Sequence, residues 1–133
     1  YKPKSLKGYY KYKAGPQFSV KGEIAPDRKD QCDIYGVLYE TDDNVQFLDG
    51  SNSLDSKNIV ALAQGLNQLK ETDEWTEFNF DFKPQNNKTI DSEKLEKGVY
   101  KLAIVFSSSA GGAKFEGAVG STLYIDQVEI VNE

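Results

Sequence analysis

The chain has 133 residues and a net charge of −5, which argues against a nucleic-acid partner because phosphate binding needs a basic patch. It has no histidine and one cysteine, and this excludes Ser-His-Asp and Cys-His catalysis, the usual zinc sites and an internal disulfide. Carboxylate chemistry, calcium held by oxygen ligands, and binding without catalysis stay open.

No apolar run approaches the length of a membrane span, and no signal peptide is visible. The chain starts at Tyr1 and contains no methionine, so we expect a processed or excised piece whose targeting signal or lipid anchor would lie upstream. For the lysine-rich stretch Lys2–Lys13, a strand with a solvated lysine face is favoured over polyanion binding.

Strand-like segments recur along the chain, separated by polar, Gly- or Asn-rich turns. In chain order they are Ser5–Lys13, Phe18–Ile24, Cys32–Glu40, Val45–Leu48, Asn58–Ala63, Glu74–Phe82, Val99–Ser107, Lys114–Val119 and Thr122–Val131. The helical spacing of Leu62, Leu66 and Leu69 predicts at most one turn of helix. The pattern predicts one all-β domain over residues 1–133, a two-sheet antiparallel β-sandwich of eight to nine strands with jelly-roll topology.

The strand Cys32–Glu40 carries different residues on its two faces. Cys32 is in phase with Leu38, which predicts a buried thiol rather than a nucleophile. Tyr35 and Tyr39 lie on the other face. They either present their rings to a sugar in a groove or are half-buried with satisfied hydroxyl groups.

Phase also separates the aromatic residues of Glu74–Phe82. Its three phenylalanines share one face, whereas Trp75 falls on the polar face and is either an exposed platform or a cap on the core. Tyr9 alternates with lysines and is expected at the surface. Flat aromatic rings bind the apolar side of a sugar, so the candidate carbohydrate-binding aromatics are Trp75, Tyr39, Tyr35 and Tyr9.

The segment Val99–Ser107 is apolar on both faces, which predicts a strand inside a layered sheet rather than at a wet edge. The loop that follows contains only Ser, Ala and Gly up to Gly112, so its hydroxyl and backbone groups are within reach of a ligand. Ser108 and Ser109 are its candidate carbohydrate-binding residues. A flexible hairpin connection is the alternative.

Two acidic residues stand out near the C-terminus. Glu116 lies between a phenylalanine and a glycine turn, and it is a candidate for carbohydrate binding or for one acid of a glycoside-hydrolysing pair. With 21 acidic residues, however, some pairs reach catalytic separation by chance. In Thr122–Val131 the apolar phase shifts across Asp126 and Gln127, which predicts a β-bulge that redirects the Asp126 side chain.

Several segments carry a resemblance to a known family: GYYKYK at Gly8–Lys13, CDIYGVLYE at Cys32–Glu40, NIVALA at Asn58–Ala63 and VFSSSAGGAKFEGAVGSTLYIDQVEI at Val105–Ile130. The chain resembles, over nearly its whole length, the "putative carbohydrate metabolism domain" at the C-terminus of secreted or surface lipoproteins of gut Bacteroidetes. The resemblance implies a jelly roll similar to carbohydrate-binding and galactose-binding-like modules. It also implies an extracytoplasmic location, at the bacterial cell surface or in the periplasm. It transfers no catalytic residues.

Carbohydrate-binding jelly rolls often hold a structural calcium through an aspartate of the last strand, and Asp126 occupies a similar place. The acidic residues that the N-terminal strand usually supplies are lysines here. We therefore expect no required cofactor, with a structural calcium at Asp126 as an open alternative.

Together these features favour a non-catalytic carbohydrate-binding module of a larger extracytoplasmic glycan-handling protein. The expected partner is an oligo- or polysaccharide, with membrane contact only through a lipid anchor outside this piece and a monomeric state. A structural or adhesive surface module is the first alternative. A glycoside hydrolase that uses a carboxylate pair is the second.

Overall fold

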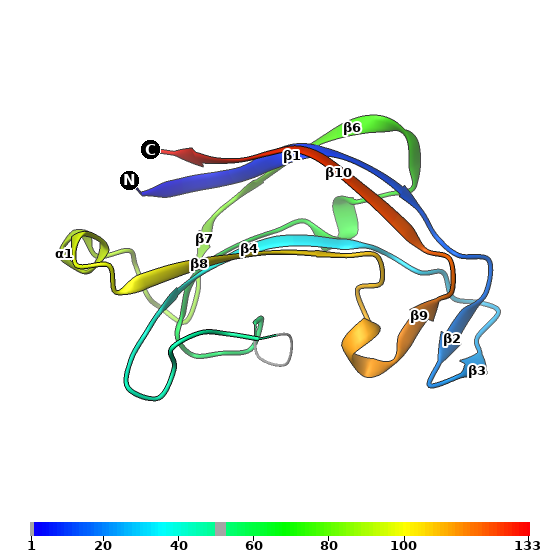
Figure 1. The fold of residues 1–133 in the computed structure, drawn as a ribbon, viewed down its shortest axis with the longest axis horizontal. Helices are drawn as coiled ribbons and strands as arrows, with labels where there is room; N and C mark the ends of the chain where they lie inside the picture. Colours follow the sequence, from blue (N-terminus) through cyan, green and yellow to red (C-terminus); the bar gives the residue numbers. More distant parts are fainter. Residues whose placement is uncertain (1, 50–52) are drawn as a thin grey trace.

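The computed structural model describes residues 2–49 and 53–133, and within them no helix is long and apolar enough to cross a membrane (Figure 1). The strands are β1 (Pro3–Lys13), β2 (Phe18–Val20), β3 (Glu23–Ile24), β4 (Asp33–Glu40), β5 (Ile59–Gln64), β6 (Thr72–Asp81), β7 (Lys83–Pro84), β8 (Tyr100–Ser107), β9 (Glu116–Ala118) and β10 (Thr122–Asn132). The helical elements are the 3₁₀ turns η1 (Leu66–Gln68) and η2 (Gly112–Lys114) and the short helix α1 (Ser92–Glu96).

Two antiparallel sheets are layered on each other, as the sequence predicts. Sheet A has the strand order β10-β1-β6, and sheet C has the order β7-β5-β4-β8. A small sheet B, β3-β2-β9, lies at the end of the sandwich away from the two chain termini (Figure 1). The fold is therefore an all-β sandwich in which β1 and β4 are inner strands of the two main sheets.

The core lies between sheets A and C and is built by alternate residues of their strands. Leu6 of β1 and Ile34 of β4 are completely buried there. The rings of Phe78 and Phe80 on β6 stack with their centroids 5.5 Å apart. Cys32 joins this cluster with no exposed surface, and burial raises the pKa of its thiol to about 12. The predicted burial of the thiol is confirmed.

The outward face of sheet C is also covered. Tyr35, Val37 and Tyr39 of β4 form a second buried cluster with Ile59 of β5, and Leu48 packs against it. Leu48 belongs to the covering segment, which we define as residues 41–49 and 53–58. This segment runs beneath β4 and β8 in Figure 1. Segment Val45–Leu48, predicted as a strand, forms no strand, because Leu48 contacts the face of the sheet rather than its edge.

The prediction that Val99–Ser107 lies inside a sheet is wrong. Among the described residues β8 pairs only with β4, so it forms the edge of sheet C. Its inward side chains Leu102, Ile104 and Phe106 are 41%, 36% and 41% exposed. The alternation of apolar residues shows which face a side chain takes, but strand order decides whether a neighbour covers it.

Two local features also depart from the sequence-based prediction. The segment Phe18–Ile24 divides into β2 and β3 because Lys21 and Gly22 have positive φ angles of 50° and 87°. Helix α1 was not predicted, and the carboxylate of Asp91 caps it by accepting a hydrogen bond from the backbone N–H of Lys94. The single turn predicted around Leu66 is present as η1.

Candidate functional site

The outward face of sheet A carries aromatic and charged side chains that are open to solvent. Tyr9 of β1 lies opposite Glu77 of β6 on one side and Asp126 of β10 on the other. Trp75 is 46% exposed and Tyr124 is 56% exposed. We call this surface the aromatic face and define it by Tyr9, Lys11, Trp75, Glu77, Tyr124, Asp126 and Gln127.

A β-bulge shapes this face where the sequence predicts one. Lys7 pairs with Glu129, but Tyr9 pairs with Asp126, so β10 has one more residue than β1 in this interval. Gln127 takes a positive φ angle of 51°, and its N–H donates a hydrogen bond of 2.8 Å to Oδ1 of Asp126. The bulge thus fixes the carboxylate of Asp126 in the row that contains Tyr9.

A shallow depression of about 260 Å³ lies beside the bulge. The Nζ atom of Lys11 is 4.7 Å from the centroid of the Trp75 ring, a cation–π contact that orients the indole. The hydroxyl of Tyr9 donates a long hydrogen bond of 3.4 Å to Glu77. The residues that line the depression are Tyr9, Trp75, Asp126 and Gln127.

This arrangement suits a ligand with one apolar face and many hydroxyl groups. The rings of Trp75 and Tyr9 offer flat apolar surface. The carboxylates of Asp126 and Glu77 accept hydrogen bonds, and the amide of Gln127 both donates and accepts them. An aromatic platform with convergent polar groups is the usual composition of a sugar-binding surface.

Three other predicted residues lie around a groove on the outward side of sheet C. Tyr35, Ser109 and Glu116 line a groove of about 720 Å³, which we call the β4–β8 groove. Its walls come from residues 53–55 of the covering segment and from the segment 107–116. The hydroxyl of Tyr35 lies 2.6 Å from the hydroxyl of Ser53, and Glu116 forms an ion pair of 3.2 Å with Arg28.

Asp30, which the sequence does not single out, holds one wall of this groove. It is only 6% exposed, and its Oδ2 accepts hydrogen bonds from the hydroxyls of Ser109 at 2.6 Å and Ser121 at 2.5 Å. The same oxygen accepts the backbone N–H of Ala118 at 2.9 Å. The hydroxyl hydrogen of Ser109 is therefore used inside the protein, and only its lone pairs can meet a ligand.

Two predicted residues line neither surface. Tyr39 is 4% exposed beneath the covering segment, so its ring presents no platform. Tyr35 is only 6% exposed, so the buried alternative holds for both tyrosines. The backbone carbonyl of Ser108 accepts a hydrogen bond of 2.7 Å from the hydroxyl of Tyr12. The predicted residues therefore separate into two groups on opposite sides of the sandwich and do not form one site.

Asp126 was also predicted as a calcium ligand. Its Oδ1 already accepts a hydrogen bond from the N–H of Gln127. In the described part of the chain, no group of three or more His, Cys, Asp or Glu residues is placed to hold a metal ion. A calcium ion at Asp126 stays a prediction.

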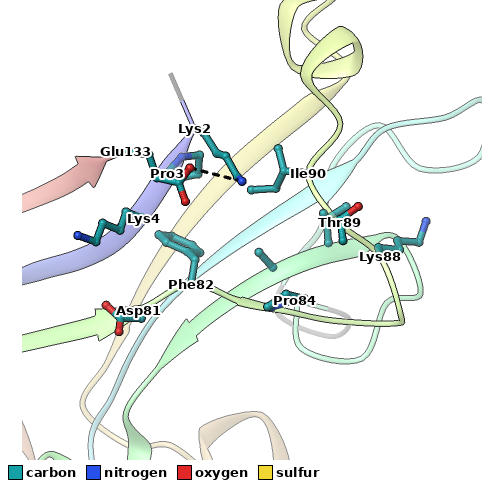
Figure 2. A pocket seen from close by; sticks show the side chains of 12 residues that line it. Lys2, Pro3, Lys4, Asp81, Phe82, Pro84, Lys88, Thr89, Ile90 and Glu133 are labelled. Atoms are coloured by element: carbon teal, nitrogen blue, oxygen red, sulfur yellow. Dashed lines mark ion pairs between the residues drawn. The ribbon is translucent and has the colours of Figure 1, made fainter.

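A further pocket, of about 380 Å³, opens at the end of the sandwich where the two chain termini lie (Figures 1 and 2). Phe82 forms part of its apolar wall, and Lys2 forms an ion pair of 3.4 Å with Glu133 at its rim. Figure 2 shows the side chains of Lys4 and Lys88 pointing outward, to either side of Phe82. The residues described around this pocket include none of the predicted site residues.

Several residues of these surfaces were missed by the sequence analysis, among them Tyr124, Gln127 and Asp33. Tyr124 lies two residues before Asp126 on the same face of β10, and this spacing was a usable signal. Gln127 reaches the surface only because of the bulge. Asp33 is in phase with Tyr35, but an acidic residue at the start of a strand gives no sign that it is buried.

Comparison with known proteins identifies a family and two similar structures. Residues 1–131 match the family described as "Putative carbohydrate metabolism domain". A search of the curated proteins finds no match. Among solved structures, a "putative glycoside hydrolase" from Bacteroides thetaiotaomicron is similar with a TM-score of 0.95 and 49% identity over 99% of this chain. A "putative glycoside hydrolase" from Bacteroides vulgatus is similar with a TM-score of 0.89 and 47% identity over 100% of this chain.

The matched region is only a part of each of these two proteins. It spans 38% of the Bacteroides thetaiotaomicron chain and 53% of the Bacteroides vulgatus chain. The family match, in contrast, extends over almost all of the present sequence. The chain therefore belongs to the putative carbohydrate metabolism domain family.

Proposed function

We propose that this domain binds a glycan on the aromatic face of sheet A without cleaving it. The observation that carries the proposal is the exposed pair of rings, Trp75 and Tyr9, beside the carboxylate that the bulge fixes at Asp126. Such rings stack on the apolar side of a pyranose, while the carboxylate accepts its hydroxyl hydrogens. The family's connection with carbohydrates supports the ligand class.

The shape of the aromatic face favours binding over catalysis. The depression beside Trp75 is shallow and lies on an open sheet, so it does not enclose a glycosidic bond or exclude water. A flat surface instead suits several consecutive sugars of a chain, each of which contributes a small amount of binding energy.

We further propose that the domain keeps a larger extracytoplasmic protein attached to its glycan. Both similar Bacteroides proteins are longer than this chain and each is named a "putative glycoside hydrolase", which supports a partnership between a binding domain and other domains. Attachment of this kind raises the local substrate concentration for the rest of the protein.

The first experiment is a glycan-array screen of the 133-residue chain, repeated with calcium and with a chelator. Trp75 is the only tryptophan, so its fluorescence reports directly on the aromatic face in titrations with each glycan that binds. The test variants are Trp75→Ala and Tyr9→Ala. Phe47→Ala is the matched control, because Phe47 is 72% exposed on the covering segment of the other sheet.

We expect both test variants to weaken binding by about tenfold or more while the control binds as the wild type does. Equal binding by Trp75→Ala and the wild type would exclude the aromatic face. Binding that is lost only when the chelator is present would show that it needs a divalent cation, for which Asp126 is the predicted ligand. If the domain binds none of the glycans on the array, the result would favour a structural or adhesive module.

Hydrolysis is the second candidate function, and one arrangement favours it. Glu116 and Asp33 line the same groove, and burial raises the pKa of Asp33, as a general acid requires. Glu116 is held by the ion pair with Arg28. If this pair is catalytic, prolonged incubation with a bound glycan will release reducing sugar, and Asp33→Asn and Glu116→Gln will each abolish the release.

A further inference from the structure

The β4–β8 groove combines polar and apolar walls on the face of the molecule opposite to the aromatic face. Its volume of about 720 Å³ is within the range of sites for small molecules, roughly 300–1,000 Å³. The polar residues that line it include Asp33, Ser107 and Ser109, and the apolar residues include Leu54, Val105, Ala110 and Ala113.

Asp33 is the unusual member of this lining. It begins β4 opposite Ser107 of β8, and its side chain is on the outward face with only 5% of the residue exposed. Its Oδ2 accepts a hydrogen bond of 3.0 Å from the amide of Gln64, and the backbone N–H of Ile34 also stabilises the carboxylate, but Oδ1 has no hydrogen bond of good geometry in the described part of the protein. A buried carboxylate oxygen without a donor is unfavourable, so a donor that reaches it from the groove would stabilise it.

The wall beside Asp33 is fixed in place. Asp30 fastens Ser109, Ala118 and Ser121 together through one carboxylate oxygen. Packing at this point is close: a Cβ atom on Gly117 would lie 2.8 Å from the hydroxyl oxygen of Ser109. A groove with a rigid wall retains its shape before a ligand arrives, which lowers the entropy that binding costs.

We infer that the β4–β8 groove is a second carbohydrate-binding site, in which the Asp33 carboxylate accepts a hydrogen bond from a hydroxyl group of the glycan. This inference rests on the proposed function for the class of ligand, a glycan, but it concerns a different surface of the domain. A sugar hydroxyl supplies the donor that Oδ1 lacks, and the serine oxygens at Ser107 and Ser109 accept further hydroxyl hydrogens. The methyl groups of Ala110 and Val105 contact the C–H side of the ring.

The two sites face away from each other, since they lie on the outward faces of sheets A and C. They differ in shape, because one is an open platform and the other is a groove. A single domain can therefore contact two separate stretches of a polysaccharide, or two neighbouring chains, and so bind more tightly than through either site alone.

The test compares binding at the two sites in the full 133-residue chain. Short cello-, xylo-, manno- and chito-oligosaccharides are titrated by calorimetry, which detects both sites. The same titrations are followed by Trp75 fluorescence, which detects only the aromatic face. The groove variants are Asp33→Asn, which preserves size, and Ala113→Phe, which fills space from an exposed position of the wall. Asp126→Asn is the matched carboxylate control on the aromatic face.

We expect two binding events in the wild type by calorimetry. Asp33→Asn and Ala113→Phe should each weaken one event by at least about tenfold and leave the fluorescence titration unchanged. Trp75→Ala should remove the other event only. A further outcome is that calorimetry detects binding that the groove variants weaken while the fluorescence of Trp75 never changes. That result would contradict the proposed site on the aromatic face and support the site in the groove. If both groove variants bind in the same way as the wild type, or if Trp75→Ala abolishes all binding, the second site does not exist.

Discussion

Tyr9 and Tyr39 occupy equivalent places in the two sheets and have opposite surroundings. Each is on an inner strand, and each points outward from its sheet. Tyr9 lies on the open aromatic face, whereas Tyr39 is 4% exposed because the covering segment packs over sheet C. Alternation along a strand tells on which side of a sheet a residue lies, and a segment without regular structure decides whether that side is available to a ligand.

The sharpest test of this contrast is to truncate both tyrosines. Tyr39→Ala should lower the free energy of unfolding by about 3–5 kcal/mol, because it removes a large ring from a closed cluster. Tyr9→Ala should change it by no more than about 1 kcal/mol. Urea denaturation measures both values. Equal losses in the two variants would show that the covering segment does not separate the two faces.

Removal of the carboxylate of Asp30 tests how firmly the groove wall is held. Asp30→Ala leaves buried donors of Ser109, Ser121 and Ala118 without their acceptor, so we expect a loss of at least about 2 kcal/mol. Asp27→Ala is the control, because Asp27 is exposed in the same turn and should change stability by only about 0.5 kcal/mol. A stable Asp30→Ala variant would mean that the wall needs no such anchor.

A smaller effect is expected when the covering segment itself is loosened. Leu48→Ala removes part of the contact with the second cluster, and because Leu48 is only partly buried we expect a loss of roughly 1–2 kcal/mol. Hydrogen exchange in β4 should accelerate, while exchange in β1 should stay the same. Faster exchange in both strands would indicate global unfolding instead of local opening.

The smallest expected effect concerns Asp33 and depends on pH. Burial raises the pKa of Asp33, so the folded state keeps its proton to higher pH than the unfolded state does. Stability is therefore lost as the pH rises from the unfolded-state pKa of about 3.9 through the folded-state value. Asp33→Asn should match the wild type in Tm at acidic pH and exceed it slightly at neutral pH. A Tm difference that is the same at every pH would contradict this.

Much of the fold follows from the sequence because it depends on local patterns. Period-two alternation located nearly all of the strands, and the phase shift at Asp126 located the bulge. The alternation pattern could not predict the strand order, because the edge position of β8 results from pairings between distant segments. The polar phase of Trp75 left an exposed platform and a core cap both open, and the structure shows it exposed. Phase alone did not decide the place of Tyr39 either, because its cover lies elsewhere in the chain.

The division of the candidate residues between two surfaces could not be predicted for the same reason. Tyr35, Ser109 and Glu116 meet at one groove only through the pairing of β4 with β8 and through the network around Asp30. The free oxygen of Asp33 depends on which donors other segments bring near it. Such facts concern tertiary contacts, and a single sequence contains no periodic signal for them.

The place of β1 between β6 and β10 has a consequence for how the protein is made. Among the strands of this domain β1 is synthesised before the others, and sheet A is complete only when the last of them, β10, has been added. During translation the strands of sheet C are all finished earlier, so the aromatic face is the last surface to assemble. Pairings across so long a stretch of chain close slowly. The fluorescence of the single tryptophan should therefore follow the final step of refolding.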